Sequence, residues 1–81
     1  MNQMANKYLR ENILQVVDNQ LQENNPAITK ATFERLKALG YTKEQAKEKI
    51  AAVLLEEIYD LLKNNESYNE VRYTKGLEEL K

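Results

Sequence analysis

The chain has 81 residues, of which 42% are hydrophobic and 31% are charged, with only two glycines and one proline. This length suits one small domain, and this composition favours helices over sheets. The chain has neither cysteine nor histidine, which excludes disulfides, thiolate or imidazole metal ligands, a cysteine nucleophile and histidine-based proton transfer. We therefore expect one all-α domain that spans residues 1–81.

The first predicted element is a helix from about residue 4 to residue 23. Apolar side chains recur on one of its faces at helical spacing. They are Leu9, Ile13, Val16, Val17 and Leu21, with Leu14 at the margin. The asparagines that follow suit a turn, and Pro26 disfavours helical geometry at Asn25, so the helix is expected to end before them.

A second helix is predicted over residues 26–39, and its start has two possible positions. Asn25 and Pro26 suit an N-cap and a first helical residue, whereas Thr29 is a competing cap that would start the helix at Lys30. The positions predicted to face inward are Ile28, Thr32, Leu36 and Leu39. Gly40 follows where the end of a helix favours a left-handed residue.

The third helix is predicted over residues 43–64 and is the longest. Thr42 and Gln45 have the spacing of a capping box at its start. At about 100° per residue, its apolar side chains span an arc of roughly 200°, which is wider than one contact stripe. The arc comprises Ile50, Ala51, Val53, Leu54, Leu55, Ile58, Leu61 and Leu62. We expect this helix to lie centrally and to contact more than one neighbour.

A fourth helix is predicted over residues 67–80, where Ser67 and Glu70 have capping-box spacing. The stripe that follows at helical spacing is Tyr73, Leu77 and Leu80. Gly76 lies beside this stripe, where it either weakens the helix or permits a close approach to the third helix. The short loops favour antiparallel neighbours, so the predicted fold is a compact bundle of four helices with a long central third helix.

One charged side chain lies inside the apolar arc of the third helix. From residue 50 onward Glu57 falls among apolar positions, whereas Glu56 and Asp60 fall on the polar side. An unpaired buried carboxylate costs several kcal/mol, so Glu57 is predicted to have a cationic partner in a structural ion pair. Arg72 and Arg35 are the candidates. Arg72 is favoured because a short loop folds the fourth helix back along the third.

Charge is unevenly distributed along the chain. Residues 29–49 hold six basic and three acidic residues and sum to +3, whereas residues 50–81 sum to −3. The basic segment reads as helix, glycine turn, helix, an outline shared with helix-turn-helix DNA readers. However, Glu44 and Glu48 stand where phosphates would lie, which favours a solvated face with exposed ion pairs. A nucleic-acid-associated regulatory protein that uses residues 30–49 is therefore the alternative function.

The leading hypothesis is a protein-binding or self-associating module that is not an enzyme. No acidic loop of calcium-binding spacing exists, and the acids of the third helix cannot share one site, so no catalytic residue, metal or cofactor is expected. An exposed remainder of the apolar arc would make a helix-pairing surface. Its candidate residues are Leu55, Tyr59 and Leu62. The chain lacks a run of roughly 20 apolar residues and a secretory apolar core, so the cytoplasm is the expected location.

A pattern of short motifs runs through residues 25–80. It reads Asn-Pro, Thr-x-x-Arg-Leu, Gly, Ala, Ile-Ala-x-Val-Leu-x-x-Glu-Ile, Leu-Lys and Arg-Tyr before a leucine-ended tail. The residues that carry it are Asn25, Pro26, Thr32, Arg35, Leu36, Gly40, Ala46, Ile50, Ala51, Val53, Leu54, Glu57, Ile58, Leu62, Lys63, Arg72, Tyr73, Leu77 and Leu80. This pattern resembles a small family of bacterial helical domains of unknown function. The resemblance implies a bacterial cytosolic protein with an all-helical fold, and it brings no established activity.

The chain departs from this family pattern at one position. A second proline often follows Asn-Pro in the pattern, whereas this chain has Ala27. The change loosens the start of the second helix and touches no candidate site.

Overall fold

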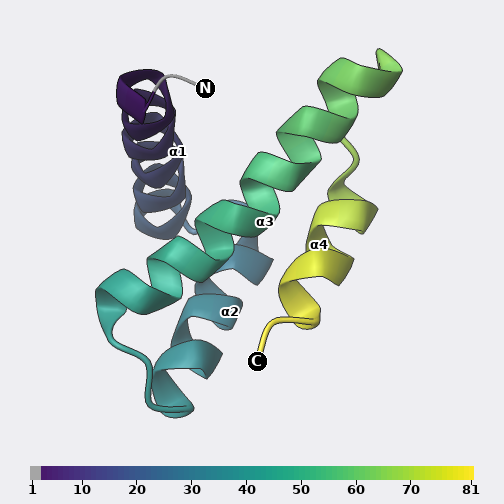
Figure 1. The fold of residues 1–81 in the computed structure, drawn as a ribbon. Helices are drawn as coiled ribbons and strands as arrows, with labels where there is room; N and C mark the ends of the chain where they lie inside the picture. The colour runs from purple at the N-terminus through teal and green to yellow at the C-terminus, as the bar shows by residue number, and fades with distance from the viewer. Residues whose placement is uncertain (1–2) are drawn as a thin grey trace.

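Four helices make up the part of the chain that the structure describes. The computed structural model describes the backbone of residues 3–81 and the side chains from Leu9 onward. The helices are α1 (Gln3–Glu23), α2 (Ala27–Ala38), α3 (Lys43–Asn64) and α4 (Glu70–Glu78) (Figure 1). The fold is all-α, and α3 is the longest of the described helices, as the predicted range of residues 43–64 indicated.

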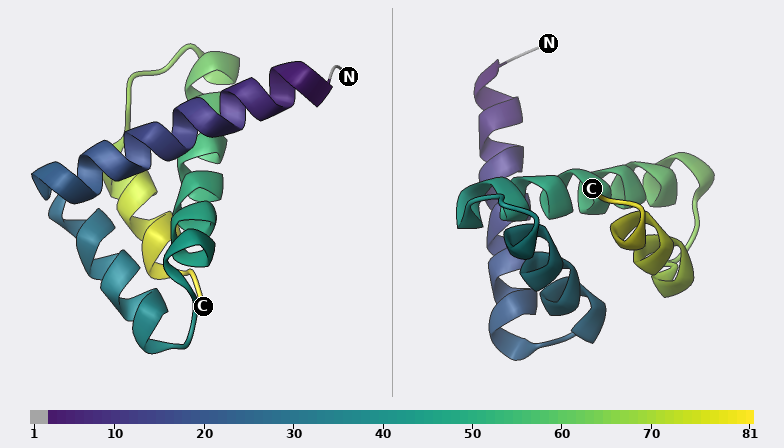
Figure 2. Two further views of the ribbon diagram at one scale, coloured as in Figure 1. Left: turned by 90° about the vertical axis from the view of Figure 1, so that its left-hand side faces the viewer. Right: turned by 90° about the horizontal axis from the view of Figure 1, so that it is seen from below.

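α3 lies at the centre and packs against the other three helices. α2 and α4 lie on the same side of α3 and run in the opposite direction to it, whereas α1 crosses α3 steeply (Figures 1 and 2). The antiparallel arrangement predicted from the short loops thus holds for two neighbours of α3 and not for α1. The N-terminal part of α1 extends past α3, as Figure 2 shows in both views.

The core lies where the inward faces of the four helices meet. Its buried apolar side chains are Ile13, Val17, Phe33, Leu36, Ala46, Ile50, Ala51, Leu54, Tyr73 and Leu77. Of these ten, α3 supplies four and each other helix supplies two. The wide apolar arc of α3 is therefore used to meet several neighbours at once.

Side-chain caps fix where α3 and α4 begin. The capping box predicted for α3 is confirmed, since Thr42 Oγ1 accepts from the Gln45 backbone N–H at 3.1 Å and Gln45 Oε1 accepts from the Thr42 N–H at 2.9 Å. The predicted Ser67 cap is wrong. Asn69 caps α4 instead, and its Oδ1 accepts from the Arg72 backbone N–H at 3.0 Å. Asparagine caps a helix as well as serine does, and α4 begins directly after Asn69.

α2 begins at Ala27, close to the earlier of its two predicted starts. Pro26 occupies the cap position without a side-chain hydrogen bond. Thr29 does not cap the helix, because its side chain is buried and its hydroxyl donates to Gln20 Oε1 at 2.8 Å. Leu39 was expected to face inward but is 60% exposed, since α2 has ended one residue earlier and the chain turns away.

Gly40 forms the turn between α2 and α3 with a φ of +107°, and nothing lies within 4 Å of the position that a Cβ would occupy. Gly40→Val should therefore cost about 1 kcal/mol or more of unfolding free energy, because a β-branched residue disfavours this backbone conformation. Urea denaturation of both proteins measures the difference. The unfolding free energy of Gly40→Ala, which lacks the β-branch, should lie between those of the wild type and Gly40→Val. An unchanged denaturation midpoint for Gly40→Val would contradict a strained turn.

Gly76 allows α4 to approach α3 closely, which was one of its two predicted roles. A Cβ on Gly76 would lie 2.8 Å from Val53 Cγ1. Gly76→Ala should destabilise the protein by about 1 kcal/mol, because overpacking of about 1–3 kcal/mol outweighs a gain of up to about 1 kcal/mol in helix propensity. Thermal unfolding in a Val53→Ala background is the control. There the clashing methyl is gone, and the same change should be neutral or stabilising.

Candidate functional site

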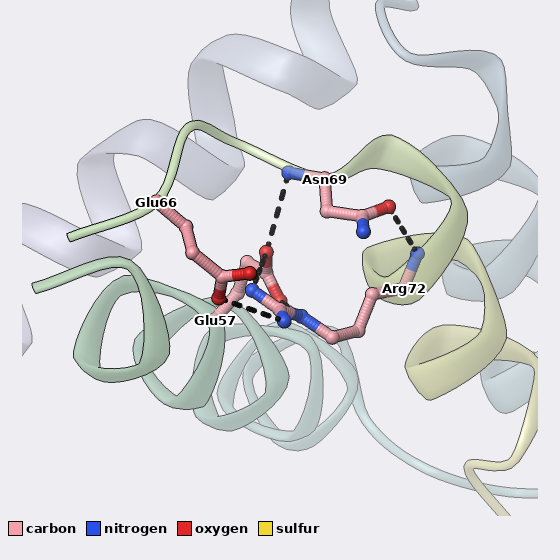
Figure 3. A network of polar contacts seen from close by, with 4 residues as sticks. All are labelled: Glu57, Glu66, Asn69 and Arg72. Atoms are coloured by element: carbon pink, nitrogen blue, oxygen red, sulfur yellow. Dashed lines mark hydrogen bonds and ion pairs between the residues drawn. The ribbon is translucent and has the colours of Figure 1, made fainter. Parts of the chain in front are cut away.

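Glu57 and Arg72 form a bidentate ion pair between α3 and α4 (Figure 3). Arg72 Nε donates to Glu57 Oε2 at 2.7 Å, and Arg72 Nη2 donates to Glu57 Oε1 at 2.9 Å. The backbone N–H of Asn69 also donates to Glu57 Oε1, at 3.3 Å, and Arg72 Nη1 donates to Glu66 at 3.3 Å. The Glu57 side chain is only 4% exposed. The favoured partner of Glu57 is thus the one that the structure places against it.

The pair keeps both of its groups charged. The pKa of Glu57 lies below its ordinary value, chiefly because the Arg72 side chain hydrogen-bonds to the carboxylate, while burial acts in the opposite direction. The same hydrogen bond raises the pKa of Arg72. Because the carboxylate already accepts three hydrogen bonds, it acts as a clamp between two helices.

Acid should weaken this clamp. The folded pKa of Glu57 is lowered from 4.5, so the stabilisation is complete above the unfolded pKa and is lost as pH falls through the folded value. We expect the wild type to exceed Glu57→Gln in unfolding free energy near pH 6, and the gap to shrink towards about pH 3. Urea denaturation across this range measures the gap, and a constant gap would contradict the lowered pKa.

Arg35, the other candidate partner, lies against the far end of α4. Its Nη1 donates to the Leu80 carbonyl at 2.6 Å, and its Nη2 donates to the Leu77 carbonyl at 2.9 Å. Carbonyls at the C-terminal end of a helix lack partners within the helix, and a cation there also suits the helix dipole. Arg35 therefore holds the end of α4, while Arg72 holds its start.

A partly buried polar network that the sequence did not predict joins α1, α2 and α4. Gln20 Oε1 accepts from the Thr29 hydroxyl at 2.8 Å and from the Tyr73 hydroxyl at 3.0 Å. Both donor residues are fully buried. One feature of the sequence could have indicated this network. Gln20 is a polar residue at helical spacing from Ile13 and Val17, in a stripe that is otherwise apolar. Its partners depend on how three helices pack, which the stripe does not reveal.

An apolar groove lies between residues 9–14 of α1 and the outer face of α3. Its volume is about 420 Å³. It is lined by Leu9, Arg10, Ile13, Leu14, Glu48, Ala51, Ala52, Leu55 and Tyr59. All of these except Arg10 and Glu48 are apolar or aromatic, and those two form an ion pair with each other. The groove therefore combines an apolar surface with one charged pair at its rim.

The residues predicted as an interaction surface follow this groove along α3. Leu55 is partly buried, whereas Tyr59 and Leu62 are 54% and 75% exposed. Leu55 and Tyr59 line the groove, and Leu62 lies beyond its lining. Together with the exposed Ala52, these residues repeat at spacings of three, four and three, as in the seam of a coiled coil.

The basic segment of residues 30–49 makes many contacts within the chain. Four of its six basic side chains have partners in the fold. The contacts are Arg35 with the carbonyls of α4, Lys47 with Asp18, Lys37 with the Phe33 ring and Lys49 with the Tyr41 ring. Glu44 and Glu48 are exposed on the same segment. The nucleic-acid alternative stays a prediction, which binding to generic DNA or RNA at about 50 mM salt would support.

Comparison with protein-family models, with curated proteins and with solved structures finds no match to this chain. The resemblance of residues 25–80 to a bacterial helical family therefore stays a prediction. Among the residues that the structure describes, no group of three or more acidic side chains is placed to hold a metal ion. None of the described helices combines the length and the apolar character that a membrane span requires.

Proposed function

We propose that this chain is a small bacterial cytoplasmic module that binds an apolar helical segment of a protein in the α1–α3 groove and performs no chemistry of its own. An apolar groove of about 420 Å³ that continues into exposed large side chains carries this proposal. Contiguous apolar surface of this kind, rimmed by charged residues, is typical of protein-binding sites.

The spacing of the exposed residues suits a helix as the ligand. Ala52, Leu55, Tyr59 and Leu62 form a stripe on α3 that would interlock with the apolar stripe of a second helix. Tyr59 also has the character of a binding anchor, because a tyrosine provides a large contact area at a low cost in conformational entropy. The Arg10–Glu48 pair would form the polar rim.

The polar clusters in the rest of the molecule support a module without chemistry. The Glu57 carboxylate is bound by Arg72 and by a backbone N–H. The Gln20 side chain is likewise engaged by two buried hydroxyls. Each of these two clusters holds helices together, whereas the apolar groove leaves the large Tyr59 side chain 54% exposed at its edge.

Photo-cross-linking from residue 59 tests this function. Tyr59 is replaced by benzoylphenylalanine, which places a photoreactive ring at the groove, and the exposed Glu34 on α2 is replaced in the same way as the control. After irradiation of cells that express each protein, position 59 should give a discrete protein adduct that position 34 does not give. If position 59 gives only unlinked monomer, or the same adducts as position 34, the groove is not a binding surface.

A further inference from the structure

We infer that the segment bound in the groove belongs to a second copy of this chain, so that two chains form a two-fold dimer through α1 and α3. This inference rests on the proposed function and names its partner. Two independent observations carry it. The folded chain exposes more surface than is typical for a monomer of its mass. In addition, the groove has one basic and one acidic residue beside it, so two copies of it can match each other in charge.

The exposed surface exceeds that of a typical compact monomer. The accessible surface is 5854 Å², whereas a folded chain of 9.5 kDa is expected to expose about 5,050 Å². The excess of about 800 Å², taken over the whole chain, is similar in size to the area of about 800 Å² that each partner buries in a standard interface. The radius of gyration agrees, at 12.7 Å against about 11.7 Å expected for this length.

An open corner between two helices accounts for this extended shape. The backbone of α1 extends past α3 (Figure 2), and residues 9–14 of α1 and the outer face of α3 form two arms with the groove between them. A two-fold axis beside the groove would place the α1 arm of each chain in the corner of the other. Such an arrangement covers both grooves at once and closes the assembly at two chains.

The charges at the rim favour a copy of the same chain over a strongly charged peptide. Arg10 on α1 and Glu48 on α3 lie side by side, with side chains 60% and 51% exposed. In a two-fold interface, a contact between one residue of the first chain and another residue of the second chain occurs twice. Arg10 of each chain can therefore pair with Glu48 of the other chain. A partner with charges of a single sign would face a like charge at one of the two residues.

Sedimentation equilibrium of the purified full chain tests the inference. Between about 1 μM and about 1 mM, the wild type should change from monomer to dimer. Tyr59→Glu places a charge in the interface and should weaken dimerisation at least about 100-fold, whereas Val71→Glu, on the 79% exposed Val71 of α4, should leave it unchanged. Circular dichroism checks that each variant is helical. If Tyr59→Glu is unfolded, Leu62→Glu takes its place, because Leu62 is 75% exposed.

Charge exchange provides an independent measurement on the same dimer. Arg10→Glu and Glu48→Arg should each weaken dimerisation about tenfold, and the double variant should restore it. A wild type that stays monomeric at about 1 mM, or a dimer that Tyr59→Glu leaves unchanged, would overturn the inference. If the protein is a monomer and position 59 still cross-links to a different protein, the inference of a second copy is wrong and the proposed function stands. A monomer with no adduct would end both.

Discussion

Replacing Leu54 with alanine should lower the free energy of unfolding by about 2–5 kcal/mol. Leu54 is 6% exposed and lies on the inward face of α3, where the helices meet. Truncation removes its buried methyl groups and leaves a cavity that the surrounding helices fill only in part. Domains of this size have a total stability of about 4–12 kcal/mol, so this single change should bring the protein close to unfolding.

Urea denaturation followed by circular dichroism measures this loss. The matched control is Leu39→Ala, because Leu39 is 60% exposed just beyond the end of α2. That change should alter the stability by no more than about 0.5 kcal/mol. If Leu54→Ala costs less than about 1 kcal/mol, below the usual range for a buried leucine, then Leu54 does not belong to the core.

Replacing Glu57 with alanine should cost about 2–3 kcal/mol, whereas the same change at Glu56 should cost almost nothing. Loss of the Glu57 carboxylate leaves the Arg72 guanidinium without its main partner and removes an acceptor from the Asn69 N–H. Breaking a buried pair costs about 3–5 kcal/mol. The expected value is lower here, because the Arg72 side chain is 35% exposed and gains contact with water. Glu56 lies exposed on the polar face of the same helix.

A double-mutant cycle separates the ion pair from other effects of the substitution. The cycle combines Glu57→Ala with Arg72→Ala, and each protein is unfolded in urea. Removing Arg72 should have a smaller effect once Glu57 has gone, because their interaction is then already lost. Additive effects of the two changes, or equal small losses for Glu56→Ala and Glu57→Ala, would contradict a stabilising pair.

Glu57 shows how much of this fold could be predicted from the sequence. Helical periodicity places its carboxylate among apolar positions, and the cost of burying a charge then requires a partner. The short loop before α4 indicated Arg72 as that partner. The capping box of α3 could likewise be predicted from residues that are close in the sequence, Thr42 and Gln45. Each of these inferences depends on neighbours in the sequence or on a single chain reversal.

Features that depend on the packing of three helices could not be predicted in this way. A stripe of apolar residues indicates which face of a helix is buried, but not which helix will cover it. The steep crossing of α1 over α3, the bonds from Thr29 and Tyr73 to Gln20, and the role of Arg35 all depend on that missing information. The prediction of Ser67 as the cap of α4 failed for a different reason, since Ser67 and Asn69 are both good caps and lie within two residues of each other.

The double attachment of α4 has a consequence for how this chain exchanges hydrogen with solvent. A helix of nine residues is too short to persist alone in water, and α4 is held at its start by Glu57 and at its end by Arg35. Its amide protons, shielded only while α2 and α3 are in place, should exchange through global opening rather than through local fraying. The shortest helix should thus be among the slowest segments to take up deuterium.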